Sequence, residues 1–443
     1  MNKALIIALL CLGIVNSMAQ NKTVQLKGEL RNFQSEVSLS KGTPEAQLLK
    51  ENIQFKTDEQ NKFELNFELD EPAYFNLGRN TLYLSPGDNL ELSLDMDAPL
   101  DAVFSGTGAE ACDYLKERPF PKAGSYLYGT DIMEGDPSAI ELGKRVAKHI
   151  KNKQEKLDAL NNVSAQFKKM EHGRILFDGA NTLMSFGYRD AYAKKVPQEE
   201  MAQYADSITN LFQSDITSYL AGGHDKDYLN IGAYLSVSSA CIKQLGEDKM
   251  DAEILDFLKV QELIYLLNRK GPIADVLSQK NEQEPQLRTD KYKGILNQAF
   301  GKYNKLIPGQ KAQNFEMTSI DGKVITLDDL KGKILVIDVW ATWCGPCKAE
   351  SPHFEALADK YQSDKMEFIS LSIDSSEKPW KKYLAEHAKT STQYITPRPR
   401  LKAYELMTVP RFMIISDDGL IIDAFAPVPS DKAFEAMIQK LIQ

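Results

Sequence analysis

The sequence predicts a multidomain protein: an antiparallel β domain, a central α-helical region and a C-terminal α/β domain. Three observations carry this prediction. Residues 20–107 contain short segments that alternate apolar and polar side chains, residues 108–300 carry apolar side chains at helical spacing, and residues 307–443 mix buried strands with helices. A chain of 443 residues has room for about three domains.

Residues 1–19 have the composition of a secretory signal peptide. A lysine near the start precedes the short apolar core Ala4 to Val15, and Ser17-Met18-Ala19 places small residues where signal peptidase cleaves. The apolar core is too short to span a bilayer. The residue before Cys11 is a leucine, whereas a lipid-modification site has a small residue there, so we expect no lipid anchor. We therefore expect an exported, periplasmic protein.

The β domain, residues 20–107, is predicted from short alternating segments with turn residues between them. Turn signals occur at 58–61 and 85–88. Such short strands are typical of a small antiparallel sandwich or open barrel. No titratable side chains cluster in this region, which favours a folding or docking module. The segments are Thr23 to Leu30, Phe63 to Leu69, Leu82 to Leu84 and Leu90 to Leu94.

The helical region, residues 108–300, is predicted from apolar residues that recur every three or four positions, with breaks at Pro197 and Gly222-Gly223. Lys280 to Lys291 has little apolar content, and we interpret it as a linker. Cys112 and Cys241 have the surroundings of buried helix positions, but a disulfide between them remains open. The helical segments are Ile140 to Leu160, Phe167 to Ala193, Met201 to Leu220 and Ile254 to Leu267.

The C-terminal domain, residues 307–443, is predicted as α/β from its order of segments. A hairpin around Asp321-Gly322 comes first, followed by strands and helices in alternation and a final hairpin and helix. The segments after the first hairpin are a strand at 334–340, a helix at 348–361, a strand at 368–373, a helix at 380–388, strands at 412–415 and 420–424, and a helix at 432–441.

The chemistry of this domain centres on Cys344 and Cys347, which follow the buried strand and begin the next helix. Two cysteines three positions apart on a first helical turn can form a disulfide. The free N–H groups and the positive dipole end of the helix stabilise a thiolate on the first cysteine. The alternative is half of a zinc site, but such a site needs a second pair of ligands, which the sequence lacks. We therefore expect redox chemistry, with Cys344 as nucleophile, Cys347 as resolving thiol and no metal or organic cofactor.

Four motifs in this domain together make the last part of the chain resemble the TlpA/ResA type of thioredoxin-like protein, a group of exported bacterial thiol-disulfide oxidoreductases. The N-terminal β region more weakly resembles a domain of unknown function that often precedes such domains. The motifs are Trp-Ala-Thr-Trp-Cys-Gly-Pro-Cys at 340–347, Asn314-Phe315 with the Asp321-Gly322 hairpin, Ser372-Ile373-Asp374, and Thr408-Val409-Pro410.

The resemblance implies that Pro410 is cis and faces the cysteine pair, leaving the backbone of Val409 to pair with an extended substrate segment. A plain loop proline is the alternative. Trp343 and Arg411 complete the predicted substrate-binding residues. Arg411 would stabilise the thiolate or steer acidic clients, or else would form a surface salt bridge.

The resemblance also implies a proton-transfer role for Asp338, a carboxylate in an otherwise apolar strand whose pKa burial should raise. An inert structural acid is the alternative. Cytosolic thioredoxins place a lysine near this acid, but Ile369-Ser370-Leu371 contains none, so the proton path is expected to differ. Glu350 is either an acid that tunes the thiols or an exposed helix residue.

The expected function is therefore reduction of protein disulfides by dithiol exchange. The partners would be disulfide-containing client proteins and a membrane electron-transfer protein that re-reduces the cysteine pair. A disulfide oxidase or isomerase is the rival within this class, and an envelope binding protein with an accessory redox domain is the rival from another. The net charge of −9 argues against nucleic acid as a partner. The sequence does not indicate an oligomeric state.

Overall fold

The computed structural model describes residues 22–34, 36–117 and 125–442, so the predicted signal peptide lies outside the described residues. The chain forms two compact units, Met1–Asp251 (unit 1) and Ala252–Gln443 (unit 2). The division therefore falls inside the region predicted as helical, and the last helices of that region belong to unit 2. None of the described helices is both long enough and apolar enough to cross a membrane.

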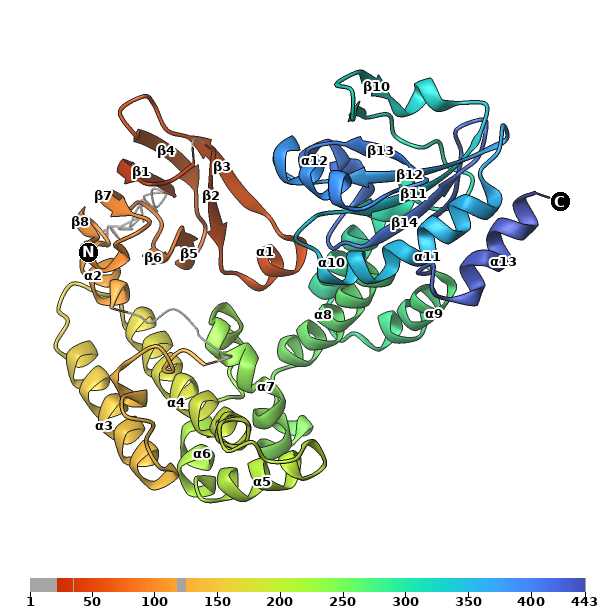
Figure 1. Ribbon diagram of the computed structural model, residues 1–443. Helices are drawn as coiled ribbons and strands as arrows, with labels where there is room; N and C mark the ends of the chain where they lie inside the picture. Colours follow the sequence, from red (N-terminus) through yellow and green to blue (C-terminus); the bar gives the residue numbers. More distant parts are fainter. Residues whose placement is uncertain (1–21, 35, 118–124, 443) are drawn as a thin grey trace, which may run out of the picture. The chain divides into compact units, whose positions relative to one another are not determined.

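Two four-stranded sheets form the β part of unit 1 (Figure 1), in the orders β4-β1-β7-β8 and β3-β2-β5-β6. Apolar side chains from both sheets share one core, which confirms a sandwich. The antiparallel prediction is wrong for one strand pair, because β1 runs parallel to β7. The strands are β1 Thr23–Arg31, β2 Glu36–Lys41, β3 Asn52–Lys56, β4 Lys62–Glu68, β5 Ala73–Leu77, β6 Asn80–Leu84, β7 Asn89–Asp95 and β8 Val103–Gly106.

The helices of unit 1 mostly follow the sandwich; α2 packs on β6 and β8 and adds Cys112 to the sandwich core, and α4 also contacts the sandwich. The ring of Phe167 on α4 lies 4.9 Å from that of Tyr83, and the Tyr74 hydroxyl donates a 2.8 Å hydrogen bond to Glu171. The helices are α1 Pro44–Leu49, α2 Ala109–Lys116, α3 Ala139–Asp158, α4 Ala165–Ala193, α5 Gln198–Asn210, α6 Gln213–Leu220 and α7 Gly232–Leu245.

Unit 2 is built on a seven-stranded sheet in the order β10-β9-β13-β12-β11-β14-β15. The interior strand β11, fifth in this order, is apolar except for one residue and is buried almost throughout, as expected for a strand covered on both faces. It runs parallel to β12 and antiparallel to β14. The strands are β9 Glu316–Ser319, β10 Val324–Thr326, β11 Ile334–Trp340, β12 Met366–Ser372, β13 Thr392–Ile395, β14 Arg411–Ile415 and β15 Ile421–Ala426.

Helices α11 and α13 lie side by side on one face of this sheet (Figure 1), where Phe354 and Phe434 pack against Val336 and Phe412. Residues of the preceding helical segment contact the sheet elsewhere. The Tyr303 ring lies 5.8 Å from that of Phe425 on β15. The helices of unit 2 are α8 Ala252–Lys270, α9 Ala274–Gln283, α10 Asp290–Gly301, α11 Gly345–Tyr361, α12 Glu377–Glu386 and α13 Lys432–Leu441.

The predicted linker at 280–291 is wrong, because the end of α9, a 3-10 turn at Glu284–Gln286 and the start of α10 occupy most of it. Asp256 on α8 fixes the start of α10: its carboxylate accepts hydrogen bonds from the backbone N–H groups of Arg288 and Thr289. A packed helical connection therefore replaces the expected flexible one.

Candidate active site

The junction of β11 and α11 positions the two cysteines. The strand ends at Trp340, and Cys344 is the N-cap residue of α11, with an extended backbone. Its Sγ atom lies 3.1 Å from the backbone nitrogen of Cys347, which donates a hydrogen bond to it. Pro346 occupies the first turn, where a missing N–H leaves no helical bond unmade. The first sulfur thus lies at the positive end of the helix, as the motif predicts.

Cys344 and Cys347 form a disulfide. Their exposed fractions are 5% and 1%, whereas the Trp343 side chain beside them is 65% exposed. Both cysteines are therefore buried, and the exposed side chain of Trp343 directly precedes them in the chain.

Asp374 braces the loop between β11 and α11. Its buried carboxylate accepts hydrogen bonds from the Thr342 backbone N–H at 3.0 Å, from the Thr342 hydroxyl at 2.8 Å and from the Ser372 hydroxyl at 2.7 Å. The motif Ser372-Ile373-Asp374 therefore has a structural role, because it ties the end of β12 to the loop that carries the cysteines.

The loop before β14 lies against Cys344. The Val409–Pro410 peptide bond is cis, as predicted, and the carbonyl oxygen of Val409 lies 3.6 Å from the Cys344 Sγ atom. Val409 and Pro410 are only half-buried. The predicted substrate-binding residues Trp343, Val409 and Pro410 thus flank the disulfide, within reach of an incoming peptide segment.

Asp338 is buried in β11, with an exposed fraction of 3%, and its Oδ1 atom has no hydrogen-bond partner among the described residues. Burial raises its pKa to about 8, an effect that the positive charge of Lys389 opposes and that Glu355 and Glu350 reinforce. The carboxyl is therefore part protonated and part ionised near neutral pH, which suits a group that exchanges protons.

A lysine does lie close enough to Asp338 to affect its pKa. It is Lys389, which the sequence analysis did not single out. Lys389 lies in the loop after α12, and its side chain is 8% exposed. Its ammonium forms an ion pair with Glu355 at 3.2 Å, contacts the Ser351 hydroxyl and lies 5.6 Å from the centre of the Trp340 ring. The residues around Lys389 in the sequence form no motif that would single it out.

The partners of Lys389 form a row along α11. Cys347, Ser351 and Glu355 recur every four residues, so they share one face of the helix. Glu355 also accepts hydrogen bonds from the backbone and hydroxyl of Ser391, at 2.9 and 2.8 Å. Ser351 and Glu355, which contact Lys389, thus lie on the same face of the helix as the resolving cysteine.

Glu350 is not simply a solvated helix residue. Its carboxylate accepts hydrogen bonds from the backbone N–H and the hydroxyl of Ser430, at 3.0 and 2.9 Å. It ties α11 to the loop before α13, and its charge contributes to the raised pKa of Asp338.

Arg411 is not at the surface, so the predicted surface salt bridge is wrong. Its exposed fraction is 5%, and its guanidinium lies 3.8 Å from the centre of the Phe425 ring. One nitrogen donates to the Ala424 carbonyl at 3.4 Å, and burial lowers its pKa to about 10. The neighbouring residue on β14, Phe412, packs with α11, and strand alternation turns Arg411 to the opposite face.

The other two described cysteines, Cys112 and Cys241, are free and buried, so the disulfide left open between them does not form. Burial raises the pKa of each thiol to about 12, which leaves them protonated and unreactive. Across residues 22–34, 36–117 and 125–442, no group of three or more His, Cys, Asp or Glu side chains could hold a metal ion.

Several known proteins are similar in sequence to the C-terminal part of the chain. The AhpC/TSA family matches residues 308–425. The thiol-disulfide oxidoreductase ResA of Bacillus cereus is 29% identical over 143 residues, which are 32% of this chain and 83% of ResA. The thioredoxin-like protein YneN of Bacillus subtilis is 30% identical over 130 residues, covering 29% of this chain and 76% of YneN.

Among solved structures, a candidate thiol-disulfide oxidoreductase of Bacteroides vulgatus is 44% identical, and the match covers 31% of this chain and 98% of that one, with a TM-score of 0.30. Each of these matches covers about a third of the chain or less, and the family match lies wholly within unit 2. Through its C-terminal domain, the chain belongs to the AhpC/TSA-type thioredoxin-like proteins and has thiol-disulfide oxidoreductases of the ResA kind among its relatives.

Proposed function

We propose that the protein is an exported protein disulfide reductase, which transfers two electrons from Cys344 and Cys347 to disulfides of client proteins. The observation that carries the proposal is the arrangement at the disulfide: Cys344 lies at a helix N-terminus and against the cis-proline loop, and Asp338 is buried in the strand that leads to it. The composition of residues 1–19 supports a periplasmic location.

The first step begins from the reduced pair. The helix N-terminus and the N–H of Cys347 favour a thiolate on Cys344. This thiolate attacks one sulfur of the client disulfide, so that a Cys344–client bond forms and the client S–S bond breaks. The departing client sulfur leaves as a thiolate and takes a proton from water. The backbone of Val409 is suitably placed to hold the client segment in an extended conformation.

The second step needs a thiolate on Cys347, which is covered from water. Asp338 in its ionised form accepts the proton of that thiol, and its pKa, which burial raises to about 8, makes it a stronger base than an ordinary carboxylate. The Cys347 thiolate attacks the Cys344 sulfur, the mixed disulfide breaks, and the second client sulfur leaves as a thiolate. The client has then gained two electrons, and the enzyme pair is a disulfide.

The cycle closes when a donor returns two electrons to the pair, and we propose a membrane electron-transfer protein as that donor. Gly345-Pro346 between the cysteines is the dipeptide of reducing thioredoxins, which favours reduction over oxidation or isomerisation as the direction.

The direction is tested by the reduction potential of the pair, followed through Trp340 and Trp343 fluorescence in a dithiothreitol or glutathione series. A value near about −270 mV, as for thioredoxin, supports a reductase. A value near about −120 mV, as for strong oxidants of the periplasm, would overturn the proposed electron flow. A pair without a reversible transition would favour a binding protein with an accessory domain.

The mechanism is tested by trapping. A Cys347→Ala variant should accumulate mixed disulfides with oxidised client proteins of the periplasm, because the second step is blocked. Cys344→Ala is the matched control and should trap nothing, since the covered Cys347 is not the attacking thiol. Equal trapping by both variants, or by neither, contradicts the proposed order of attack.

A further inference from the structure

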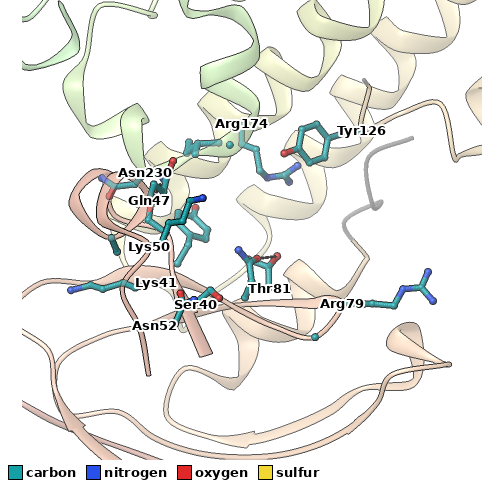
Figure 2. Close-up of a pocket in the computed structure, with 17 residues that line it drawn as sticks. Ser40, Lys41, Gln47, Lys50, Asn52, Arg79, Thr81, Tyr126, Arg174 and Asn230 are labelled. Atoms are coloured by element: carbon teal, nitrogen blue, oxygen red, sulfur yellow. Dashed lines mark hydrogen bonds between the residues drawn. The ribbon is translucent and has the colours of Figure 1, made fainter. Parts of the chain in front are cut away.

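Buried carboxylates occur in both units, but those of unit 1 are paired with a permanent charge. Arg174 on α4 forms ion pairs with Glu171 and Asp178, both at 2.6 Å, and it lines a cavity of 620 Å³ in unit 1 (Figure 2). A guanidinium does not lose its proton in proteins, so this cluster is suited to a structural role. Asp338 in unit 2 is different, because its Oδ1 atom has no hydrogen-bond partner among the described residues.

Asp338 begins a row of polar side chains on the sheet face that α11 covers. It pairs with Ser370 on β12, and Ser370 pairs with Gln393 on β13. Paired residues of neighbouring strands turn to the same face, about 5 Å apart. Val336, two positions before Asp338, belongs to the same core cluster as Phe354 of α11, which identifies this face. The side chain of Ser370 is therefore the neighbour of the acid on β12.

Hydrogen bonds continue from Ser370 towards solvent. The Ser370 and Ser391 hydroxyl oxygens are 2.9 Å apart, and the Ser391 hydroxyl donates to Oε1 of Glu355 at 2.8 Å. Both serines are buried, with exposed fractions of 1% and 4%, whereas the Glu355 side chain is 14% exposed. Because Ser391 donates to Glu355, the proton between the two hydroxyls belongs to Ser370, which is then free to accept another from the side of Asp338.

Glu355 is fixed at the outer end of these groups. Its Oε2 atom accepts hydrogen bonds from the backbone N–H groups of Thr390 and Ser391, at 2.8 and 2.9 Å. Lys389 pairs with its Oε1 atom at 3.2 Å, the same oxygen that accepts from the Ser391 hydroxyl. The side-chain amide of Gln393 donates to that hydroxyl at 2.8 Å and holds it in position. The series therefore ends on a carboxylate oxygen with a fixed place.

We propose that these groups form an exit path for the proton of the resolving thiol. Asp338 takes the proton from Cys347 and passes one, through a bridging water molecule, to the Ser370 hydroxyl. Side chains on neighbouring strands lie about 5 Å apart, a distance that one water molecule bridges. Each hydroxyl accepts one proton and releases its own, so Ser391 delivers a proton to Glu355, which releases it to solvent. No group keeps an extra proton, and Cys347 is left as the attacking thiolate.

The exit path extends the second step of the proposed function and rests on it. Asp338 is 3% exposed, and burial raises its pKa to about 8, so it is mostly protonated at pH 6. It must then lose its own proton before it can accept that of Cys347. The charged groups that act on it are Lys389, Glu355 and Glu350. A route from the buried acid to solvent is therefore needed in every turnover below about pH 8.

The test is a single turnover of the reduced full chain with dithiobis(nitrobenzoate), a small disulfide. Attack by Cys344 releases the first thionitrobenzoate in a phase that scales with reagent concentration, and attack by Cys347 releases the second in a phase that does not. Ser370→Ala and Ser391→Ala should leave the first phase unchanged and slow the second at least about tenfold at pH 6. The difference should disappear at pH 9, where Asp338 is already ionised.

Two further variants locate the path. Glu355→Gln/Lys389→Met removes the outlet together with its counter-ion, whose charges shift the pKa of Asp338 in opposite directions and so partly offset each other. The second phase should slow at pH 6 as in the serine variants. Thr392→Val is the matched control, because it removes a neighbouring hydroxyl that donates to Glu367 at 3.0 Å, outside the path. It should match the native chain at both pH values.

The outcomes separate the exit path from the dithiol exchange on which it rests. If both serine variants leave the second phase unchanged at pH 6, slow it equally at pH 6 and pH 9, or slow it no more than Thr392→Val does, the exit path is overturned and the exchange stands. A native chain that shows only the first phase overturns the exchange itself, and the exit path with it.

Discussion

At the residue scale, the buried acid Asp338 makes the stability of unit 2 depend on pH. Its pKa is about 8 in the folded chain and 3.8 as an ordinary side chain, so between these values the folded chain holds an extra proton. The contribution of Asp338 to the free energy of unfolding should therefore fall as pH rises from about 4 to about 8.

An Asp338→Asn variant tests this sign, because an amide cannot ionise. Between pH 5 and pH 7.5 the native chain should lose about 2–4 kcal/mol of unfolding free energy relative to the variant, as measured by urea denaturation. Asp364→Asn, at an exposed position, is the control and should follow the native chain. Parallel pH profiles for Asp338→Asn and the native chain would show that Asp338 ionises normally.

A second residue-scale prediction concerns Lys389, whose positive charge favours the ionised form of Asp338. Lys389→Met keeps the length of the side chain and removes the charge, so the Asp338 pKa should rise further, by about one pH unit. A carboxyl-carbon NMR titration measures it. Lys381→Met breaks a surface ion pair with Glu377 and should leave the titration unchanged. An unchanged Asp338 pKa in Lys389→Met would show that the lysine does not influence the ionisation of Asp338.

These residues also show how far sequence reasoning reaches. Cys344, Cys347, Asp338 and Pro410 can be placed because each belongs to a local motif or to a strand whose pattern is unmistakable. Lys389 cannot, because only the packing of a distant loop brings it beside Trp340. Arg411 differs from its prediction for another reason: its position at the start of β14 follows from the sequence, but the face to which its side chain turns depends on how the strand packs.

At the element scale, the brace from β12 to the active-site loop predicts a mutational effect. Asp374→Ala removes the acceptor of the Thr342 N–H and hydroxyl and of the Ser372 hydroxyl. The loss should destabilise unit 2 by about 2–3 kcal/mol, since buried donors are left unpaired. Urea denaturation measures it, with Asp364→Ala, an exposed acid, as the control. A loss equal to the control would mean that the motif does not hold the loop.

Elements in which the hydrophobic pattern repeats several times can be predicted from the sequence, whereas very short strands and the direction in which strands pair cannot. The spacing alone predicts the long helices α3, α4 and α8 and the buried strands β11 and β12, but it predicts one helix where α5 and α6 lie and does not indicate α7. The four-residue strand β13 was missed, because Thr392–Ile395 has too few residues to show a period. The parallel pairing of β1 with β7 is set by the packing of the sandwich, and no local pattern encodes it.

At the scale of the whole molecule, the composition of α8 to α10 does not reveal which unit they join. Their contacts decide it. The Phe425 ring occupies the space that a side chain at Gly271 would need, and Tyr303 stacks near the same ring, with Arg411 beneath it. The helical segment thus covers an aromatic ring and a buried guanidinium on the sheet.

Two fragments test this assignment. The fragment 252–443 should fold and keep the reduction potential of the full chain, because the cysteine pair and the backbone of Val409 that contacts it belong to unit 2. The fragment 307–443 contains the same redox site but exposes Phe425 and leaves Arg411 without its cover, so it should be less stable by several kcal/mol. Urea denaturation of both fragments compares their stabilities directly.

A substitution of Phe425 in both fragments tests the same cover. In 307–443, Phe425→Ser should lower the free energy of unfolding by about 1 kcal/mol or less, since the ring is already exposed, whereas in 252–443 it should lower it by about 3 kcal/mol. Equal stability of the two fragments would mean that α8 to α10 only rest on the sheet, and the domain would then begin at 307.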